Sequence, residues 1–353
     1  MNQIVKEDII NIINSETIPW ERFRNKYILI TGATGMIPSY LVWVLIMLNE
    51  IKSYNIKIYL LFRNLNKAQN IFKDYLNKDY INILLQDVCD PINISDSIDY
   101  IIHGASNASP KYYGTDPVGT ARANIIGTDN LLQLAKNNRV ESFLFMSSGL
   151  IYGTTTNENA IIFETDRGTL DPLDVRNCYG ESKRAGENLC VDYHYQFGVN
   201  VKIARVFHTL GPYVDLNDNR AFSDICKSFV ENKNIILRSD GSAKRTFLYI
   251  ADAVKAFFLI LLKGEPGEAY NVGSRLNEIS IKELAYLLVG RYPEKNVEVE
   301  FSIDPASLEY TKMKNPVDRI IPATDKLSAL GWSAEFRLPD IFSRTIDAIS
   351  MTL

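Results

Sequence analysis

The chain has 353 residues, of which 46% are hydrophobic and 23% are charged, and its formal net charge is -4 at pH 7. This composition is typical of a globular protein that buries a large core in one domain or in two unequal ones. The slightly negative charge offers no basic field to a nucleic-acid backbone, so we expect no nucleic-acid binding. The four cysteines form no CxxC pair, which predicts free thiols and no metal site.

The N-terminus mixes acidic and apolar residues and lacks the basic start of a secretory signal. Apolar residues from Val5 to Ile13 recur at helical spacing and Pro19 ends this stretch, so we predict a helical extension over residues 1–25. The longest apolar run, Leu41 to Leu48, is far shorter than a membrane span. These features predict a cytoplasmic protein without a membrane partner.

Continuous apolar runs alternate along the chain with stretches long enough for helices. Such runs are typical of parallel strands that are buried on both faces. They occupy residues 27–31, 56–62, 81–86, 99–105, 142–148 and 200–207. The alternation predicts an α/β fold, a Rossmann-type doubly wound parallel sheet with ligands bound at the carboxyl ends of its strands.

The texture of the sequence changes after Phe207, where an Asn/Asp-rich loop at Asp215 to Asn219 precedes shorter elements. We therefore expect a smaller mixed lobe that binds the substrate, and a strand at 269–273 that returns to the main sheet. The predicted division assigns 26–206 and 246–273 to the sheet domain, and 207–245 and 274–353 to the smaller lobe.

A phosphate-binding turn follows the first predicted strand, where YILITGATGM places Gly32 and Gly35 before a new helix. Glycines let the backbone approach a pyrophosphate, and a helix N-terminus offers unpaired N–H groups and a positive dipole end. In a βαβ unit this turn indicates dinucleotide binding. Pro38 stands where a third glycine normally permits tight packing of the helix on the strand. It argues against close packing there, although proline is tolerated in a first helical turn.

The second strand ends in Arg63 and Asn64 rather than in an acid that would bind the ribose hydroxyls. Arg63 suits a 2′-phosphate and therefore favours NADP, although an arginine stacked on adenine would accept NAD as well. Asp87, after the third strand, is placed to meet the adenine amino group or to cap a helix. The candidate cofactor residues up to this point are Gly32, Thr34, Gly35, Met36, Ile37, Arg63, Asn64, Asp87, Val88, Ala105 and Ser106.

Tyr179 and Lys183 are four residues apart in a helical register, so they share one helix face and an ammonium can lie beside a phenol. Such a phenol, with a pKa of about 10, needs a shift of ~3 units to lose its proton near neutrality, or ~4 kcal/mol. A cation ~4 Å away at an effective dielectric near 20 supplies about this much. We therefore expect Lys183 and a positive nicotinamide ring to lower the pKa of Tyr179. Ser148 would hold the reacting hydroxyl and share its proton.

These three residues are the candidate catalytic set, and Tyr179 and Lys183 are also candidate cofactor contacts. The whole pattern resembles the extended short-chain dehydrogenases of the NAD-dependent epimerase/dehydratase family, which act on nucleotide-sugars. The resemblance covers the chain from Lys26 onward. The segments most similar to UDP-glucuronate decarboxylases are ASNASPKYY (105–113), DPLDVRNCYGESKR (171–184), KIARVFHTLGP (202–212) and RTFLYIADAV (245–254).

The resemblance also implies substrate contacts. Arg245 and Arg319 would grip the nucleotide diphosphate or ribose, with Arg220 in the same lobe. His208 stands where relatives usually carry Asn near the sugar phosphate, or else it packs as a loop histidine. By the same resemblance, helices around Asn124 to Lys136 and Tyr179 to Tyr193 would form the four-helix contact of a homodimer. The apolar residues that support this contact are Ile125, Leu131, Leu132, Leu134, Leu189 and Val191.

Leu150 departs from the family pattern in a way that bears on the reaction. Decarboxylases of this group carry Glu at this position, and 4,6-dehydratases carry Asp-Glu where this chain has Gly149-Leu150, so a dehydratase is disfavoured. Epimerisation through a 4-keto sugar needs only hydride removal and return on the opposite face, and it is the leading interpretation.

Decarboxylation is the alternative, because oxidation at C4 makes a β-keto acid that loses carbon dioxide without a dedicated acid. In that case Tyr112, Tyr113 and Arg176 would hold the carboxylate, and Ser109 completes the candidate substrate residues. A catalytically silent NAD(P)-binding regulator is the third interpretation, against which the intact Ser-Tyr-Lys set argues.

Overall fold

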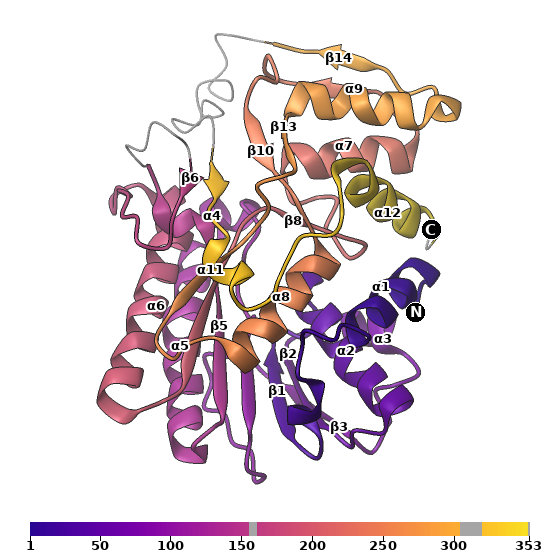
Figure 1. The fold of residues 1–353 in the computed structure, drawn as a ribbon. Helices are drawn as coiled ribbons and strands as arrows, with labels where there is room; N and C mark the ends of the chain where they lie inside the picture. Colours follow the sequence, from indigo (N-terminus) through magenta and orange to yellow (C-terminus); the bar gives the residue numbers. More distant parts are fainter. Residues whose placement is uncertain (155–160, 304–319, 352–353) are drawn as a thin grey trace.

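The computed structural model describes residues 1–154, 161–303 and 320–351. Its centre is a seven-stranded parallel sheet in the order β12-β7-β5-β4-β1-β2-β3 (Figure 1). The strands are β1 (Tyr27–Thr31), β2 (Lys57–Phe62), β3 (Ile81–Leu85), β4 (Tyr100–His103), β5 (Ser142–Ser148), β7 (Val201–Val206) and β12 (Ala269–Val272). The predicted parallel sheet is thus confirmed, including the late strand that returns to it.

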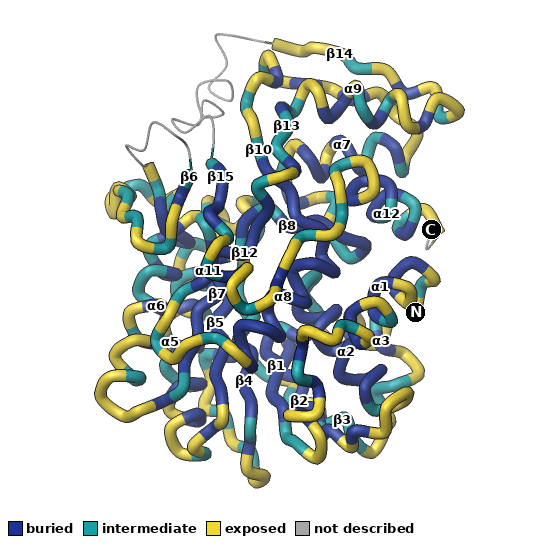
Figure 2. Tube along the Cα trace, viewed as in Figure 1, coloured by how far each residue is buried: buried dark blue, intermediate teal, exposed yellow. Residues whose placement is uncertain are grey.

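Helices cover both faces of this sheet because its strands are apolar on both sides. Ile28 and Ile30 of β1 join the core beneath α2 (Met36–Lys52) and α8 (Ile250–Lys263), whereas Leu29 joins the core beneath α5 (Pro117–Asn138) and α6 (Cys178–Phe197). This alternation follows from the two-residue period of a strand. The central strands are accordingly buried along their length (Figure 2).

The packing of α5 and α6 on the sheet bears on the predicted homodimer, because it covers some of the apolar residues that were expected to face a partner. Leu131, Leu132 and Leu134 are buried within the chain against the sheet, so they add no apolar surface for a partner. The apolar surface available to a partner is therefore smaller than the sequence suggests, because the sheet of the same chain already covers these leucines. Ile125 and Val191 remain exposed.

The predicted N-terminal helix is present as α1 (Gln3–Ile13) and is built into the core. Its Asp8 is buried and accepts hydrogen bonds from Tyr40 Oη at 3.0 Å, Tyr249 Oη at 2.6 Å and Arg344 Nη2 at 2.8 Å. Burial raises the pKa of this carboxyl, and the three partners oppose that effect. Asp8 therefore ties α1 to α2, to the start of α8 and to the C-terminal helix α12 (Leu338–Ser350).

Shorter elements extend beyond the carboxyl ends of the strands, where α7, α9 and α12 lie together (Figure 1). Small two-stranded pairings join β10 to β13, β11 to β8, β14 to β9 and β15 to β6. The strands are β6 (Ile161–Ile162), β8 (Thr209–Leu210), β9 (Ile235–Leu237), β10 (Lys244–Thr246), β11 (Leu248–Tyr249), β13 (Glu278–Ser280), β14 (Val299–Phe301) and β15 (Ile321–Pro322). The remaining helices are α3 (Leu65–Phe72), α4 (Lys111–Thr115), α7 (Ala221–Glu231), α9 (Ile281–Arg291) and α11 (Asp325–Ser328). The division into an extension, a sheet domain and a substrate lobe stays a prediction.

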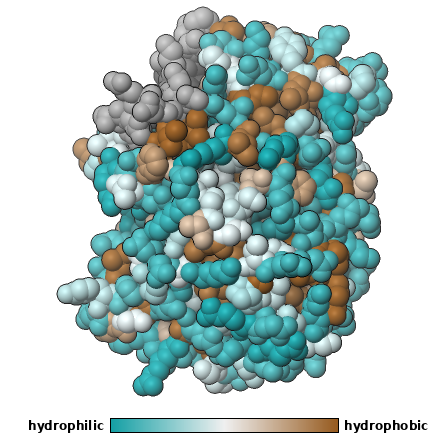
Figure 3. Space-filling view, viewed as in Figure 1, coloured by the Kyte–Doolittle hydropathy of each residue, from teal (hydrophilic) through white to brown (hydrophobic). Residues whose placement is uncertain are grey.

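The surface of the face in Figure 3 is mainly hydrophilic, with hydrophobic side chains in separate groups. Across the part of the chain that the structure describes, no helix is both long enough and apolar enough to cross a lipid bilayer.

Candidate active site

The turn after β1 has the geometry of a phosphate cradle. Gly32 has a φ of +66°, and a Cβ there would lie 2.7 Å from the Cα of Ala105, so only glycine fits. Gly35 is the N-cap of α2 and no side chain caps this helix, which leaves the first-turn N–H groups of Met36 and Ile37 to an anion. The half-buried Thr34 lies between the two glycines. These residues fit the pyrophosphate of a dinucleotide.

Close packing of α2 on the sheet is retained despite Pro38. This proline lies in the first turn of the helix and is buried, and a Cβ on Gly104 at the end of β4 would lie 2.7 Å from its Cγ. The glycine that permits close approach is thus on the strand side of the contact. The expectation that Pro38 loosens this packing is therefore wrong.

The polar residues after β2 and β3 are engaged with one another. Arg63 Nη1 lies 3.0 Å from Asp87 Oδ2, and the Arg63 side chain is 64% exposed. Asp87 Oδ1 accepts the N–H of Cys89, while Asn64 caps α3 by accepting the N–H of Lys67. Arg63 and Asp87 therefore lie together where the adenosine end of a dinucleotide would extend from the phosphate cradle, and Asn64 serves mainly as a helix cap.

Asn124, which the sequence analysis missed, connects the end of β4 to α6. It is fully buried on α5, accepts a hydrogen bond from Ser106 Oγ at 2.8 Å and donates one to Ser182 Oγ at 2.9 Å. Ser182 in turn donates to the carbonyl of Tyr179 at 3.1 Å. The signal that could have found it is a run of polar residues at helical spacing, Thr120, Asn124 and Thr128, on the buried side of the helix. Val88 is also buried, and its carbonyl accepts from α5.

Ser148, Tyr179 and Lys183, the candidate catalytic residues, are brought together between β5 and α6. Tyr179 is 6% exposed, and Ser148 is one of the groups that lower the pKa of its hydroxyl. Lys183 is 2% exposed, donates to the carbonyl of Met146 at 2.7 Å, and places Nζ 5.7 Å from the centroid of the Tyr179 ring. The predicted arrangement of an ammonium beside a phenol is thus present in this geometry.

Among the protein's own groups, Lys183 is not one of those that lower the pKa of Tyr179. Burial raises the pKa of Tyr179, and the charge of Arg220 and the bond with Ser148 offset this only in part. Burial also lowers the pKa of Lys183 to about 7. Both side chains are removed from water, and desolvation disfavours the charged form of each. The expectation named Lys183 together with a positive nicotinamide ring, so it stays a prediction for the enzyme with its cofactor.

Tyr113 forms one wall of this site. Its ring stacks on that of Tyr179, with centroids 5.2 Å apart and an angle of 17° between the planes. Its hydroxyl donates to the carbonyl of Ala108 at 3.0 Å, and Arg220 Nη2 donates to the same oxygen at 2.8 Å. The loop after β4 therefore joins the catalytic helix to the start of α7.

His208, Arg220 and Arg245 form a second group beyond the strands. Burial, followed by the charges of Arg245 and Arg220, lowers the pKa of His208 to about 3, so the imidazole is neutral at physiological pH. The rings of Phe222 and Phe247 pack against it at 5.9 Å and 6.0 Å. Two arginines whose charges act on a neutral, packed imidazole are of the residue type that binds phosphate oxygens.

The other candidate substrate residues are placed differently. Ser109 Oγ donates to the carbonyl of Asp218, and Tyr112 is exposed. Arg176 is exposed and makes a bidentate pair with Asp174, at 3.0 Å and 2.5 Å. Arg319 lies outside the described residues.

Leu150 lies two residues after Ser148, in the short helix Gly149–Tyr152, and it is 50% exposed. Two acidic side chains in the neighbouring described segments are engaged elsewhere. Glu164 Oε1 accepts the N–H of Asn271 at 2.9 Å, and Glu181 pairs with Arg184 at 3.7 Å. The side chain beside the candidate catalytic set is therefore apolar.

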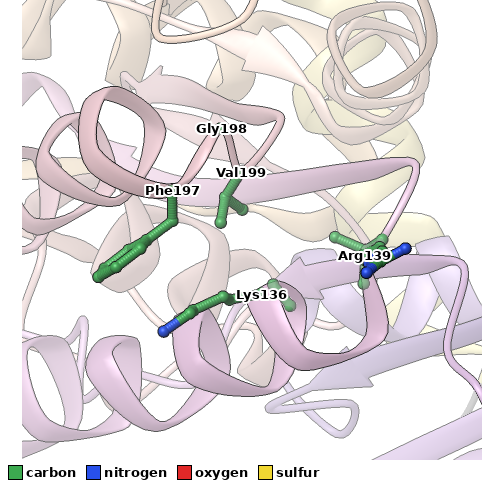
Figure 4. Close-up of a pocket in the computed structure, with 7 residues that line it drawn as sticks. Lys136, Arg139, Phe197, Gly198 and Val199 are labelled. Carbon is green, nitrogen blue, oxygen red and sulfur yellow. The ribbon is translucent and has the colours of Figure 1, made fainter.

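A separate pocket of about 130 Å³ lies between the C-terminal ends of α5 and α6. Lys136 and Arg139 line it together with Phe197, and Lys136 Nζ lies 4.0 Å from the centroid of the Phe197 ring (Figure 4). It is at the opposite end of α6 from Tyr179 and holds none of the candidate residues. Nor does the described part of the chain bring together three or more His, Cys, Asp or Glu side chains that could hold a metal ion.

Known proteins that resemble this chain include two UDP-glucuronic acid decarboxylases. UDP-glucuronic acid decarboxylase 5 of Arabidopsis thaliana is 30% identical over 321 residues, which cover 89% of this chain and 86% of that protein. UDP-glucuronic acid decarboxylase 4 of the same plant is 30% identical over 311 residues, which cover 88% of this chain. The match spans 66% of that second protein, slightly less than two thirds.

Solved structures with the same fold include UDP-glucuronic acid 4-epimerase from Bacillus cereus in complex with NAD. It has a TM-score of 0.73 at 25% identity, over 92% of this chain and 97% of that one. UDP-glucose 4-epimerase from Thermotoga maritima has a TM-score of 0.76 at 20% identity, over 92% of this chain and 99% of that one, a likeness of fold alone. The model of the NAD dependent epimerase/dehydratase family matches residues 28–273. With its Rossmann sheet, its phosphate cradle and this match, the chain belongs to the NAD-dependent epimerase/dehydratase family.

Proposed function

We propose that this enzyme is an NAD-dependent nucleotide-sugar epimerase that works through a transient 4-keto sugar. The observation that carries the proposal is the joint placement of Ser148, Tyr179 and Lys183 beside a half-exposed Leu150. Oxidation of a sugar hydroxyl requires the first three residues. Loss of water also requires an acid and a base, which the residue pair Gly149-Leu150 does not supply.

The substrate would lie across the carboxyl ends of the strands, as ligands do in open α/β sheets. Arg220 and Arg245 would bind the diphosphate by charge-assisted hydrogen bonds, while the neutral His208 adds a polar contact without a third charge. The sugar would then extend toward the stacked rings of Tyr113 and Tyr179. Arg220 and Tyr113 both donate hydrogen bonds to the carbonyl of Ala108. The phosphate end and the sugar end of the proposed substrate site are therefore joined through this carbonyl.

In the proposed reaction, Ser148 orients the C4 hydroxyl and Tyr179 accepts its proton. NAD, which the cradle around Gly32 and Gly35 would hold, would supply the hydride acceptor and donor and a positive charge. Because burial raises the pKa of Tyr179, proton transfer depends on that added charge and on the Lys183 ammonium. Leu150 presents no hydrogen-bonding group to the sugar, so it does not oppose rotation of the keto sugar before the hydride returns to its other face.

Decarboxylation is the second candidate, and the two Arabidopsis relatives favour it by their names. It needs the same oxidation at C4, after which a C6 carboxylate leaves as carbon dioxide. Tyr113, whose ring stacks on Tyr179, would contact that carboxylate, but Arg176 is engaged with Asp174. A carboxylate contact from Arg176 would require that ion pair to open.

Product analysis distinguishes the two candidates. The purified enzyme is incubated with UDP-glucose, UDP-glucuronate and related GDP and CDP sugars, and the products are analysed by mass spectrometry and NMR. An isomer of unchanged mass supports epimerisation. Loss of carbon dioxide from UDP-glucuronate establishes the decarboxylase instead, and loss of water contradicts both.

A further inference from the structure

One face of α6 is hydrogen-bonded to the end of β5 at two successive positions. Residues four apart on a helix lie one above the other, so one face can carry several groups toward the same strand. Lys183 donates to the carbonyl of Met146 at 2.7 Å, and Glu187 accepts from Ser147 Oγ at 2.5 Å. Tyr179 lies one turn before Lys183 on the same face, and Ser148 is one of the groups that lower its pKa against the effect of burial. Two of these helix residues are candidate catalytic groups, whereas Glu187 has no assigned role.

Glu187 is also the centre of a buried ion pair. Its carboxylate accepts hydrogen bonds from Arg205 Nε at 3.0 Å and Arg205 Nη2 at 2.8 Å, and the two side chains are 11% and 9% exposed. Arg205 lies on β7, directly opposite Ser147 in the parallel register. The pair therefore connects the catalytic helix to two adjacent strands. Its geometry is bidentate, which fixes orientation as well as distance.

The opposite side of the guanidinium supports the segment that follows Ser148. Arg205 Nη1 donates to Tyr152 Oη at 2.9 Å and to the carbonyl of Glu164 at 2.8 Å. Tyr152 closes the short helix that carries Leu150, and its hydroxyl donates to Asn271 on β12 at 2.6 Å. Displacement of Arg205 would therefore disturb the segment beside the reacting sugar as well as α6.

Several titratable groups face Lys183 from the elements around it. Burial lowers the pKa of Lys183 to about 7, while the Cys190 thiol and then Glu187, both on α6, oppose that shift. Tyr179 faces it from the same helix. His103 on β4 is buried beside it, and burial together with the Lys183 charge holds the pKa of His103 well below its usual range. Glu187 is thus a carboxylate that stabilises the Lys183 ammonium against desolvation.

We propose that Glu187 and Arg205 are a pair of positioning residues that hold Lys183 charged and in register with Ser148 and Tyr179. Arg205 orients the Glu187 carboxylate, and that carboxylate supports the ammonium one helical turn away. Neither residue touches the reacting atoms. The inference rests on the proposed use of Tyr179 and Lys183 in proton transfer, but it does not depend on which sugar product is formed.

The test needs a variant that folds without the pair. Glu187→Gln alone leaves a buried guanidinium without its counter-charge, which is strongly destabilising. The double variant Glu187→Gln/Arg205→Met removes both charges at similar volume, a change that buried ion pairs generally tolerate. The matched control is Lys255→Met/Glu335→Gln, which removes a partly buried pair at 2.7 Å that is remote from the site. Glu187→Asp keeps the carboxylate.

The first measurement follows the titration of Lys183 without turnover. Protein labelled with 13C at the lysine Cε carbons is titrated by NMR, and the Lys183 signal is assigned by its loss in Lys183→Met. We expect the titration midpoint to fall by about 1 pH unit in the double variant. It should stay at the wild-type value in the control and lie nearer to that value in Glu187→Asp. An unchanged midpoint in a folded double variant overturns the proposal.

The second measurement is the pH profile of kcat with the substrate that the wild-type enzyme turns over. The double variant should lose about tenfold or more of kcat at pH 8, with its alkaline limb moved to lower pH and KM little changed. A purely structural pair would leave kcat and its profile at wild-type values once folding is restored. If the wild-type enzyme turns over no nucleotide-sugar, the proposed function fails, and the NMR titration still decides the role of the pair.

Discussion

Tyr113 lies against Tyr179 with the two rings nearly parallel and their centroids 5.2 Å apart. This contact joins the loop after β4 to the first turn of α6, and it shields one face of the phenol from water. Tyr179 is consequently almost fully buried, and burial raises the pKa of its hydroxyl. The stacked pair explains how the phenol can be held rigidly in place and still need neighbouring positive charge to ionise.

Replacement of Tyr179 by Phe should abolish turnover and leave binding of the nucleotide-sugar nearly intact. The ring and its stacking on Tyr113 are kept, and only the proton acceptor is lost. General acid–base groups typically contribute about 10²- to 10⁴-fold, so kcat should fall by at least this factor. Stopped-flow kinetics and calorimetric binding measure the two quantities separately. Retained turnover would show that another group accepts the proton.

The ion pair between Arg63 and Asp87 should set the preference between NAD and NADP. Arg63 favours a 2′-phosphate, whereas the carboxylate 3.0 Å from it opposes one. Asp87→Asn should therefore raise the affinity for NADP relative to NAD, and Arg63→Ala should lower it. Titration of the apoprotein with both dinucleotides measures the ratio. A ratio that neither substitution changes would remove both residues from the cofactor site.

Stability should depend on pH through Asp252. Its side chain is buried at the start of α8, where Oδ2 accepts two backbone N–H groups and Oδ1 has no hydrogen-bond partner within the described residues. Burial raises the pKa of Asp252 to about 7 from 3.8. The folded state therefore binds this proton more tightly than the unfolded state. The tighter binding of this proton contributes to the free energy of unfolding. The contribution is fully present below pH 3.8 and is lost as the pH rises toward 7.

Asp252→Asn keeps the acceptor for both N–H groups and removes the buried charge. We expect the variant to be more stable than the wild type at pH 8, by about 1.4 kcal/mol for each pKa unit of the shift that is relieved. The advantage should shrink at pH 5. Denaturant unfolding of both proteins at the two pH values measures the difference. An advantage equal at both values would show that Asp252 does not titrate in this range.

A homodimer through α5 and α6 stays a prediction, and the structure narrows the residues that would form it. Val191 is 41% exposed and Ile125 is 37% exposed, whereas the three leucines of α5 are buried. Light scattering at micromolar concentration should give twice the chain mass, and Val191→Glu should shift it toward the monomer. Ile51→Glu, at an exposed position of α2, is the control. A monomeric wild type would contradict the prediction.

The sheet could be predicted from the sequence because several of its parallel strands are apolar on both faces and form uninterrupted runs, as residues 27–31 do. The placement of Tyr179 beside Lys183 could be predicted because the two residues are neighbours on one helix. Other features depend on contacts between distant segments. Gly104 compensates for Pro38 across 66 positions of the sequence, and neither residue signals the other.

Buried charges were missed for the same reason. Asp8 is one acid among several in an amphipathic N-terminal helix, and its partners Tyr249 and Arg344 are 241 and 336 residues away in the sequence. In the sequence Glu187 is an ordinary helix residue. Its ion pair with Arg205 is visible only in the structure, where β7 brings Arg205 beside it. The raised pKa of Tyr179 in the structure could not be predicted from the sequence, because the desolvation of Tyr179 depends on every element packed around it.

The claim that C4 is oxidised and then reduced on its other face is tested most directly with substrate deuterated at C4. UDP-glucose and UDP-glucuronate labelled in this way are incubated with the wild-type enzyme, with Tyr179→Phe as the inactive control. Epimerisation through a transient 4-keto sugar predicts a C4 epimer of unchanged mass that retains its deuterium, because the hydride returns to the carbon that it left. A product lighter by carbon dioxide or by water, or an epimer whose C4 deuterium has been lost, would contradict the account.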